Sequence, residues 1–297
     1  MTDSPMGGEG EAAEPDGLYA PDIKPHSVEK HGVIERYAQL FVTATRRFWQ
    51  CRMYLDLFAG AGMATVTNTG EVVPTSPLIA LRCVPQFDRF IFCDADPRCV
   101  DALRERVRRA FPAAAGRVDF ILGDSNDAVP EVFRRMPPYS KGHRVLTLCV
   151  VDPFGMRNLR FETIRRLNAR FMDFLVLIPD SMDAGRGPNP EYYLRPDIGV
   201  VDAFLGDPNW RERWAEWKRD RNPAYKYRHF GRFVAERFAA AMSTLKHRDV
   251  LPADMKQIRQ SGNRSPLYKL ALFSKSRLAA RLFKAARAED PELDLGF

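Results

Sequence analysis

Short apolar segments alternate with helical patterns over the first 180 residues of this 297-residue chain. The segments predicted as strands are residues 53–58, 90–93, 118–122, 145–151 and 171–178. Because these strands are apolar on both faces, both faces of their sheet must be covered, and the helices between them make the strands parallel. The chain is therefore expected to adopt an α/β fold, with a mostly parallel sheet and helices on both faces.

The alternation stops near residue 180, and the composition also changes at the beginning of the chain. Residues 1–22 are rich in Gly and Pro and hold six acids but no Lys or Arg, which is typical of a disordered acidic tail. We expect residues 23–297 to form one domain with a helical insertion at about 181–250. Residues 255–260 and 267–274 are predicted to add an antiparallel strand pair, followed by a final helix.

Composition excludes several classes of protein. No apolar run approaches the ~20 residues of a membrane-spanning helix, and the acidic beginning of the chain differs from a targeting peptide. We therefore expect a cytoplasmic protein with no membrane partner. The five cysteines include no CxxC pair, a spacing that suits neither zinc nor an iron–sulfur cluster. Buried free thiols and no bound metal are expected.

Two features leave nucleic-acid binding open. Residues 255–288 hold nine bases and no acid in a chain of net charge +7. Such a surface fits a polyanion, although a solvated arginine-rich face accounts for it equally well. Trp210, Trp214 and Trp217 recur at helical spacing, either as the core side of a helix or as a platform for stacked bases.

Acids and glycines follow the predicted strands, where the strand ends of a parallel sheet meet. Asp56 precedes a glycine turn that holds Gly60 and Gly62, and Asp56 could bind an ammonium group. Asp94, with Asp96 as the second choice, could accept hydrogen bonds from both ribose hydroxyls. Asp124, at the end of the third strand, could accept a hydrogen bond from the adenine amine. A nucleoside with an amino-acid tail and no phosphates is S-adenosylmethionine. Asp94 and Asp124 could instead cap the helices that follow them.

The fourth strand ends in Asp152-Pro153-Phe154-Gly155. Pro153 has no N–H, so the corner presents a carboxylate and carbonyls as acceptors beside an aromatic ring. Asp152 could accept from the amine of a flat acceptor molecule while Phe154 stacks on its ring. The alternative is an ordinary turn at the end of a strand.

These motifs resemble the class I S-adenosylmethionine-dependent methyltransferases that act on amino nitrogens. In chain order, a closer resemblance to the three-Cys-motif partner family (TcmP) rests on His26-Ser27, Lys30-His31, Asp56-Leu57-Phe58-Ala59-Gly60, Ser76-Pro77-Leu78-Ile79-Ala80-Leu81, Asp152-Pro153-Phe154-Gly155, Phe204-Leu205-Gly206 and Pro266-Leu267-Tyr268-Lys269-Leu270. Two positions depart from the family pattern, because Ala61 replaces a proline and Ser27 replaces a threonine. Neither change removes a group that could bind a ligand.

The resemblance implies a Rossmann-like methyltransferase fold, S-adenosylmethionine as cofactor, and Phe58 and Ala59 as further cofactor-binding residues. It also implies a companion radical-SAM-like protein that carries three cysteines. We expect a methyltransferase acting on an exocyclic amine of a nucleic-acid base, with Asp152, Pro153 and Phe154 at the reacting end. The alternative is a donor-binding or inactive scaffold for that companion. Residues 63–75 are long for a first turn and are predicted to form a flap over the ligand.

Overall fold

A seven-stranded sheet runs through the centre of the computed structural model, which describes residues 16–179, 191–195, 197–221 and 229–288. Its strands, in chain order, are β2 (Cys51–Asp56), β5 (Arg89–Asp94), β6 (Val118–Leu122), β7 (Val145–Val151), β8 (Met172–Ile178), β9 (Lys256–Arg259) and β10 (Pro266–Phe273). The spatial order is β6-β5-β2-β7-β8-β10-β9. The first five are parallel, and β10 pairs antiparallel with both β8 and β9.

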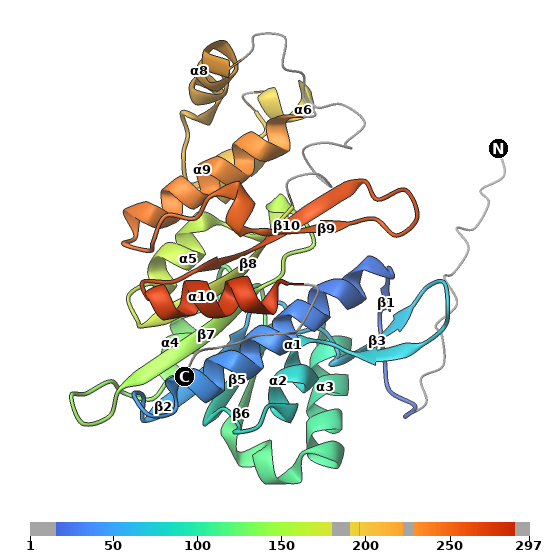
Figure 1. Cartoon of the computed structure of the whole chain (residues 1–297). Helices are drawn as coiled ribbons and strands as arrows, with labels where there is room; N and C mark the ends of the chain where they lie inside the picture. The colour runs from blue at the N-terminus through green and yellow to red at the C-terminus, as the bar shows by residue number, and fades with distance from the viewer. Residues whose placement is uncertain (1–15, 180–190, 196, 222–228, 289–297) are drawn as a thin grey trace, which may run out of the picture.

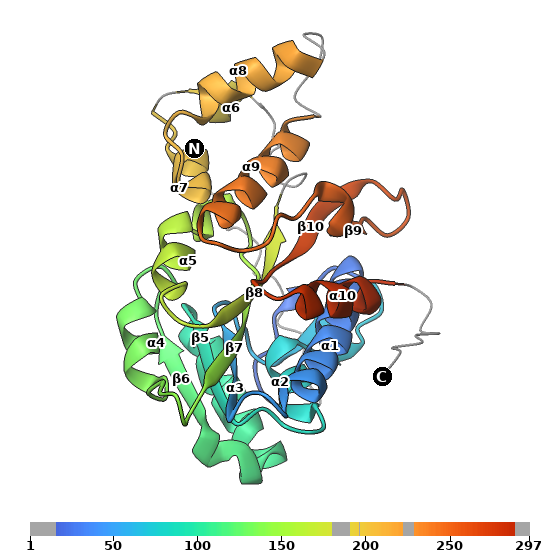
Figure 2. The same cartoon turned by 60° about the vertical axis from the view of Figure 1, so that its left-hand side comes forward.

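Helices cover both faces of this sheet (Figures 1 and 2). One face is covered by α1 (His26–Thr45), α2 (Ser76–Arg82), α3 (Pro97–Ala110) and α10 (Arg277–Ala286). The other is covered by α4 (Val129–Arg135), α5 (Phe161–Leu167), α7 (Val200–Leu205) and α9 (Phe230–Thr244), while α8 (Trp210–Arg221) packs on α7 and α9, farther from the sheet. Short connections are η1 (Pro112–Arg117), η2 (Met156–Asn158), α6 (Glu191–Leu194) and η4 (Pro252–Asp254). Successive residues of β2 show the two cores, since Met53 and Leu55 face one and Tyr54 the other.

The strand order reverses direction between β2 and β7. From β2 the chain proceeds outward to β5 and β6, then returns to place β7 and β8 on the opposite side. In an open doubly wound sheet, such a reversal leaves a ligand crevice at the carboxyl ends of the two central strands. The predicted fold class, a Rossmann-like α/β fold with a C-terminal antiparallel strand pair, is confirmed. It positions Asp56 and Asp152 on either side of the reversal.

The segment predicted as a flap loop is a β-hairpin. Its strands β3 (Met63–Val66) and β4 (Val72–Pro74) pair antiparallel, and β1 (Asp22–Ile23) adds to β3 in parallel. Strands of two to four residues are too short to show an alternating pattern, and β1 pairs with β3 from a distant part of the chain. Local sequence could therefore not reveal this small sheet.

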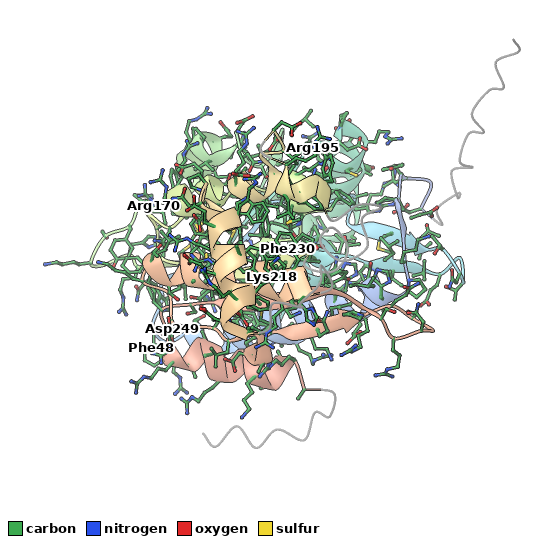
Figure 3. All side chains as sticks on the ribbon, turned by 90° about the horizontal axis from the view of Figure 1, so that it is seen from above. Phe48, Arg170, Arg195, Lys218, Phe230 and Asp249 are labelled. Atoms are coloured by element: carbon green, nitrogen blue, oxygen red, sulfur yellow. The ribbon has the colours of Figure 1, made fainter. Side chains whose placement is uncertain are left out.

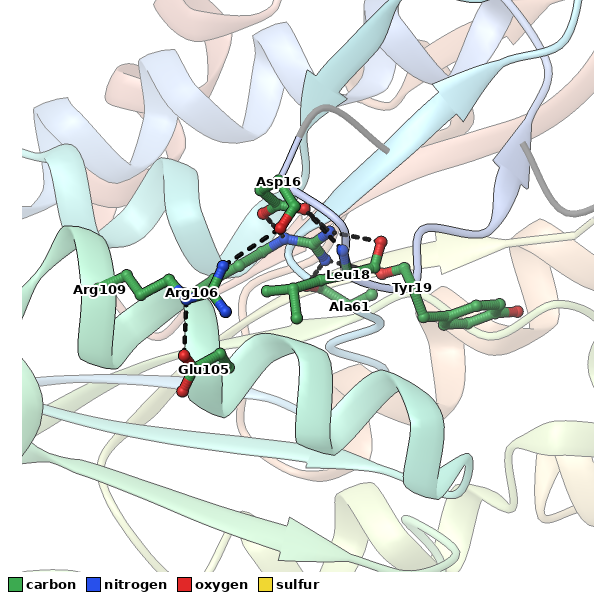
Figure 4. A network of polar contacts seen from close by, with 7 residues as sticks. All are labelled: Asp16, Leu18, Tyr19, Ala61, Glu105, Arg106 and Arg109. Atoms are coloured by element: carbon green, nitrogen blue, oxygen red, sulfur yellow. Dashed lines mark hydrogen bonds and ion pairs between the residues drawn. The ribbon is translucent and has the colours of Figure 1, made fainter. Parts of the chain in front are cut away.

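The N-terminal segment is part of the folded body from Asp16 onward, earlier than the predicted tail boundary at residue 22. Arg106 on α3 is buried and pairs with Asp16, with Nε 2.9 Å from Oδ2. The same guanidinium donates to the carbonyls of Tyr19 (2.8 Å) and Ala61 (2.6 Å), as Figure 4 shows. One buried arginine thus ties the N-terminal segment to the glycine turn. Residues 1–15 lie outside the described residues.

The chain between β8 and β9, predicted as a helical insertion, supplies α6 to α9. The three tryptophans of α8 are at most 8% exposed and pack on Phe230 and Phe233, so they belong to the core. Figure 3 labels Phe230 and Lys218 in this layer, and the Lys218 ammonium lies over the ring of Trp214, 5.2 Å from its centroid. The interpretation of the tryptophans as a base-stacking platform is therefore wrong.

All five cysteines are buried and free, as predicted. Among the described residues, no helix is long and apolar enough to cross a membrane, and no three His, Cys, Asp or Glu side chains gather as a metal site would require.

Candidate functional site

Asp56 ends β2 and is fully buried at the strand reversal. Its Oδ1 accepts a hydrogen bond from the Phe58 amide at 3.1 Å. Its Oδ2 is buried, and no described residue donates to it. Burial raises the pKa of Asp56 to about 7, against the lowering effect of the neighbouring Ser76 side chain and of the Phe58 amide. The charges of Asp152 and Asp94 raise this pKa further, so the structure gathers three of the predicted acids around one point.

The backbone amides of the turn after β2 are already used inside the protein. The Leu57 amide donates to the Val150 carbonyl (3.1 Å) and the Ala59 amide to the Cys93 carbonyl (2.9 Å). The Gly60 amide donates to Asp94 Oδ2 at 2.7 Å. These three amides are therefore not free to donate to a ligand, and what the turn can offer is close approach of its backbone. The predicted residues Phe58 and Ala59 lie in this turn, half-buried and buried respectively.

The two glycines of the turn have different reasons to be glycine. Gly60 has a φ of +63° with open space where a Cβ would point. Gly62 has a φ of +84°, and a Cβ there would lie 2.7 Å from Leu103 Cδ1. Positive φ favours glycine at both positions, but at Gly62 the packing against α3 also excludes a side chain. Gly60 is thus the residue of the pair that leaves space for a ligand.

Asp94, at the end of β5, does not cap the helix that follows it. Asp96 caps α3, because its side chain accepts from the Arg98 amide at 2.9 Å and Pro97 takes the first helical position. Asp94 instead accepts from the Asp96 amide (2.9 Å) and the Gly60 amide (2.7 Å). It therefore joins the turns after β2 and β5, where a ribose could lie between them.

Asp124 follows β6 and accepts from both the amide (2.7 Å) and the side chain (2.8 Å) of Asn126. It does not cap α4, whose N-cap is Ala128. Asn126, which the sequence did not single out, is buried and also accepts from the Arg160 amide and the Thr163 hydroxyl, both at 2.8 Å. Asn126 thereby fixes the turn after β6 to the start of α5.

Asp56, Asp94 and Asp124 form the same kind of local turn. Each accepts the amide of the residue two positions later, a turn that Asp forms readily. Asp56 and Asp94 end the neighbouring strands β2 and β5, and Asp124 follows β6, the next strand of the sheet. The three acids predicted to hold a donor therefore line the same edge of the sheet.

The corner after β7 is built from a distant part of the chain. Lys30 Nζ forms an ion pair and hydrogen bond with Asp152 Oδ2, and the exposed fractions of the two side chains are 10% and 17%. Pro153 is buried and Phe154 is 85% exposed. The corner thus presents a charge-paired carboxylate beside an aromatic ring that is open to solvent.

The first turns of α1 bring further groups to this corner. His31 is buried, and burial followed by the charge of Lys30 lowers its pKa to about 3, so its ring is neutral. Tyr268 of β10 lies edge-on to the His26 ring, with centroids 5.9 Å apart. Tyr268 Oη and His31 Nδ1 are buried without a partner among the described residues. The resemblance marked these positions as motif residues, but only the tertiary structure places them beside Asp152.

Comparisons with known proteins are distant. No family model matches this chain, and no curated protein matches it. An O-methyltransferase from Bacillus cereus, solved in complex with SAH, is 13% identical over 88% of this chain and 86% of its own, with a TM-score of 0.42. Cofactor-bound Rv0187 from MTB is 13% identical over 82% of this chain and 80% of its own, with a TM-score of 0.39.

Protein LPL1258 from Legionella pneumophila is 14% identical over 61% of this chain and 74% of its own, with a TM-score of 0.38. At such scores these likenesses carry no argument about this chain.

Proposed function

We propose that this chain is an S-adenosylmethionine-dependent methyltransferase whose acceptor is an exocyclic amine of a nucleic-acid base. The observation that carries the proposal is Asp56, a fully buried acid with an unpartnered oxygen at the strand reversal. A buried carboxylate is costly unless a cation or hydrogen-bond donor pairs with it. The ammonium of the donor's amino-acid tail would supply both.

The other acids suit the rest of the donor. Asp94 would hold the ribose hydroxyls and Asp124 the adenine amine, since an ionised carboxylate is an acceptor with two oxygens. Phe58, Ala59, Gly60 and Gly62 would shape the backbone around the amino-acid tail. These residues form no cradle for phosphates, and acids around the site disfavour a phosphorylated nucleotide.

S-adenosylmethionine, when bound, supplies a methyl group that is already activated. The protein's task is then alignment and exclusion of water rather than strong acid–base chemistry. Asp152 would accept an N–H of the acceptor amine and so direct the nitrogen lone pair. Its ion pair with Lys30 holds the carboxylate in place, which suits orientation of the acceptor. Phe154 would stack on the acceptor ring.

Titration calorimetry with S-adenosylmethionine tests the donor site. We expect one-to-one binding by the wild-type chain, loss of binding in Asp94→Ala and Gly60→Val, and near-normal binding in Asp152→Ala. Asp96→Ala is the matched control for Asp94→Ala, because it removes a neighbouring carboxylate that caps a helix. Failure of the wild-type chain to bind the donor would overturn the proposal.

Methyl transfer is tested with the donor labelled in its methyl group and total RNA or DNA as acceptor. We expect Asp152→Ala to abolish incorporation while donor binding persists. Equal loss of both would show that the corner after β7 has been assigned wrongly. The companion protein with three cysteines stays a prediction; its addition to the assay would raise incorporation if it is a partner.

A further inference from the structure

A cleft with arginines along its walls lies outside the donor site, between α5, α7, α8 and α9. Its volume is about 760 Å³, and its floor is apolar, with Phe161 and Leu205 among the lining residues. Four arginines and two acids line it: Arg160, Arg165, Arg213, Arg237, Glu162 and Asp207. The lining thus carries an excess of positive charge, which favours an anionic ligand.

Asp207 holds two of these arginines in place. Its Oδ2 lies 2.9 Å from Arg213 Nε and 3.5 Å from Arg237 Nη2. Two guanidinium groups therefore share one carboxylate, and one positive charge stays uncompensated. Arg237 Nε is also buried without a partner among the described residues. A fixed guanidinium with a free donor is the arrangement that binds phosphate oxygens well.

The other two arginines are on the solvent side of the cleft. The Arg160 and Arg165 side chains are 59% and 63% exposed. Arg160 lies 3.9 Å from Asp127, and Arg165 pairs with Glu162 one helical turn earlier. Exposed pairs of this kind contribute little stability, so either guanidinium can exchange its carboxylate for a phosphate at small cost.

The position of the cleft connects it to the donor edge of the sheet. Arg160 precedes α5, and its amide donates to Asn126, which follows Asp124. From there the cleft follows α5 toward Leu245, whose carbonyl accepts from Asn168 at 3.2 Å beyond the end of that helix. A chain of phosphates lying in the cleft would therefore lead to the site.

The basic segment 255–288 is less available than its composition suggests. Lys256 pairs with Glu29 at 3.0 Å, Lys269 donates to Gln257 at 2.7 Å, and Arg287 donates to the Ala253 carbonyl at 2.6 Å. Three of the nine bases of this segment are therefore engaged in contacts within the fold.

We propose that this arginine cleft binds the sugar-phosphate backbone of a nucleic-acid substrate. That the bound strand carries the methylated base rests on the proposed function. Binding of the strand itself can be measured without any methyl transfer. Backbone contacts would position the strand and carry little sequence information. Sequence or structure preference would come from the corner after β7.

The test is fluorescence anisotropy with a fluorescein-labelled 20-nucleotide single-stranded RNA, and with DNA of the same sequence, over a range of salt concentrations. The cleft variant is Arg160→Gln with Arg165→Gln. The control is Arg104→Gln with Arg108→Gln on α3, on the other face of the sheet. The control arginines are 55% and 69% exposed and also pair with an acid three residues earlier. The two variants therefore lose the same charge from equally exposed positions.

We expect the cleft variant to bind at least tenfold more weakly and its plot of log K against log salt to flatten by about 1.4, since each single-strand phosphate contact contributes about 0.7. The control should match the wild-type chain. Equal weakening in both variants would overturn the proposal, because it would show non-specific attraction. Displacement by millimolar inorganic phosphate as readily as by unlabelled strand would overturn it too, because it would identify a small-anion site.

Calorimetry with S-adenosylmethionine on the same variants separates the two proposals. If the donor binds and the strand is not held in the cleft, this inference fails while the proposed function stands. If the strand is held in the cleft but the donor does not bind, the proposed function fails while the cleft assignment stands.

Discussion

The two halves of the site are built by different means. In the donor half, each acid accepts an amide two residues further along the chain, so its turn is set by local sequence. In the acceptor half, Asp152 is paired with Lys30, which lies 122 residues earlier. A site can thus combine a locally encoded half with a half that exists only after folding, and the two should respond differently to mutation.

The largest expected effect concerns Asp56. Because burial raises its pKa to about 7 from 3.8, the unfolded chain releases the proton first as pH rises, and the free energy of unfolding falls between about pH 4 and pH 7. At about 1.4 kcal/mol per pH unit this loss amounts to roughly 4 kcal/mol. Asp56→Asn should abolish it.

The measurement is urea unfolding of the wild-type chain and Asp56→Asn from pH 4 to 8, comparing the difference between them so that other titrating groups cancel. A constant difference would contradict a raised pKa. Donor binding gives a second measurement, because it needs the ionised carboxylate of Asp56. The affinity of the wild-type chain for S-adenosylmethionine should fall up to tenfold for each pH unit below pH 7.

Lys30→Ala tests the acceptor half. Removing one partner of a buried pair leaves the other charge unpaired, at a cost of about 3 kcal/mol. The double variant Lys30→Ala, Asp152→Ala should recover part of this loss, which a double-mutant cycle by urea unfolding would measure. We expect donor binding to persist in both. A loss below about 1 kcal/mol would mean that water already solvates the pair.

The two glycines of the donor turn provide a matched comparison. Gly62→Ala places a Cβ against Leu103 at a positive φ and should destabilise the fold by about 2 kcal/mol. Gly60→Ala has open space and should cost about 1 kcal/mol through backbone strain alone. Thermal unfolding of both variants shows which one is destabilised more. A larger loss of stability in Gly60→Ala would show that packing against α3 does not restrict residue 62.

The smallest expected effect separates the two acids after β5. Asp96→Ala removes the N-cap of α3 and should cost about 1 kcal/mol with donor affinity unchanged. Asp94→Asn should weaken donor binding markedly, while its free energy of unfolding stays similar to that of Asp96→Ala. The comparison is made by calorimetry and thermal unfolding on the same samples. Weaker donor binding in Asp96→Ala would make Asp96 the ribose ligand.

Strand positions and the chemistry of the strand ends could be predicted from sequence alone. The strands at 118–122 and 145–151 have the predicted bounds. The strand at 145–151 is the clearest in the sequence, because all seven of its residues are buried in the sheet. The small sheet of β1, β3 and β4 could not be predicted, since its short strands depend on pairing with a remote segment. Asn126 was missed for the same reason, since nothing local indicates what it contacts. Tyr268 was named only as a motif residue of the resemblance, and its neighbours could not be predicted.

The sequence by itself determined the layered fold, the buried thiols and the acids at the strand ends, because each depends on residue type and short spacing. Only the tertiary structure decided that Asp96 rather than Asp94 caps α3, that Lys30 pairs with Asp152, and that the tryptophans of α8 are core. It also decided where the arginines gather. Those outcomes depend on which distant surfaces meet, and in a parallel sheet the crossovers bring together side chains that are far apart in the chain.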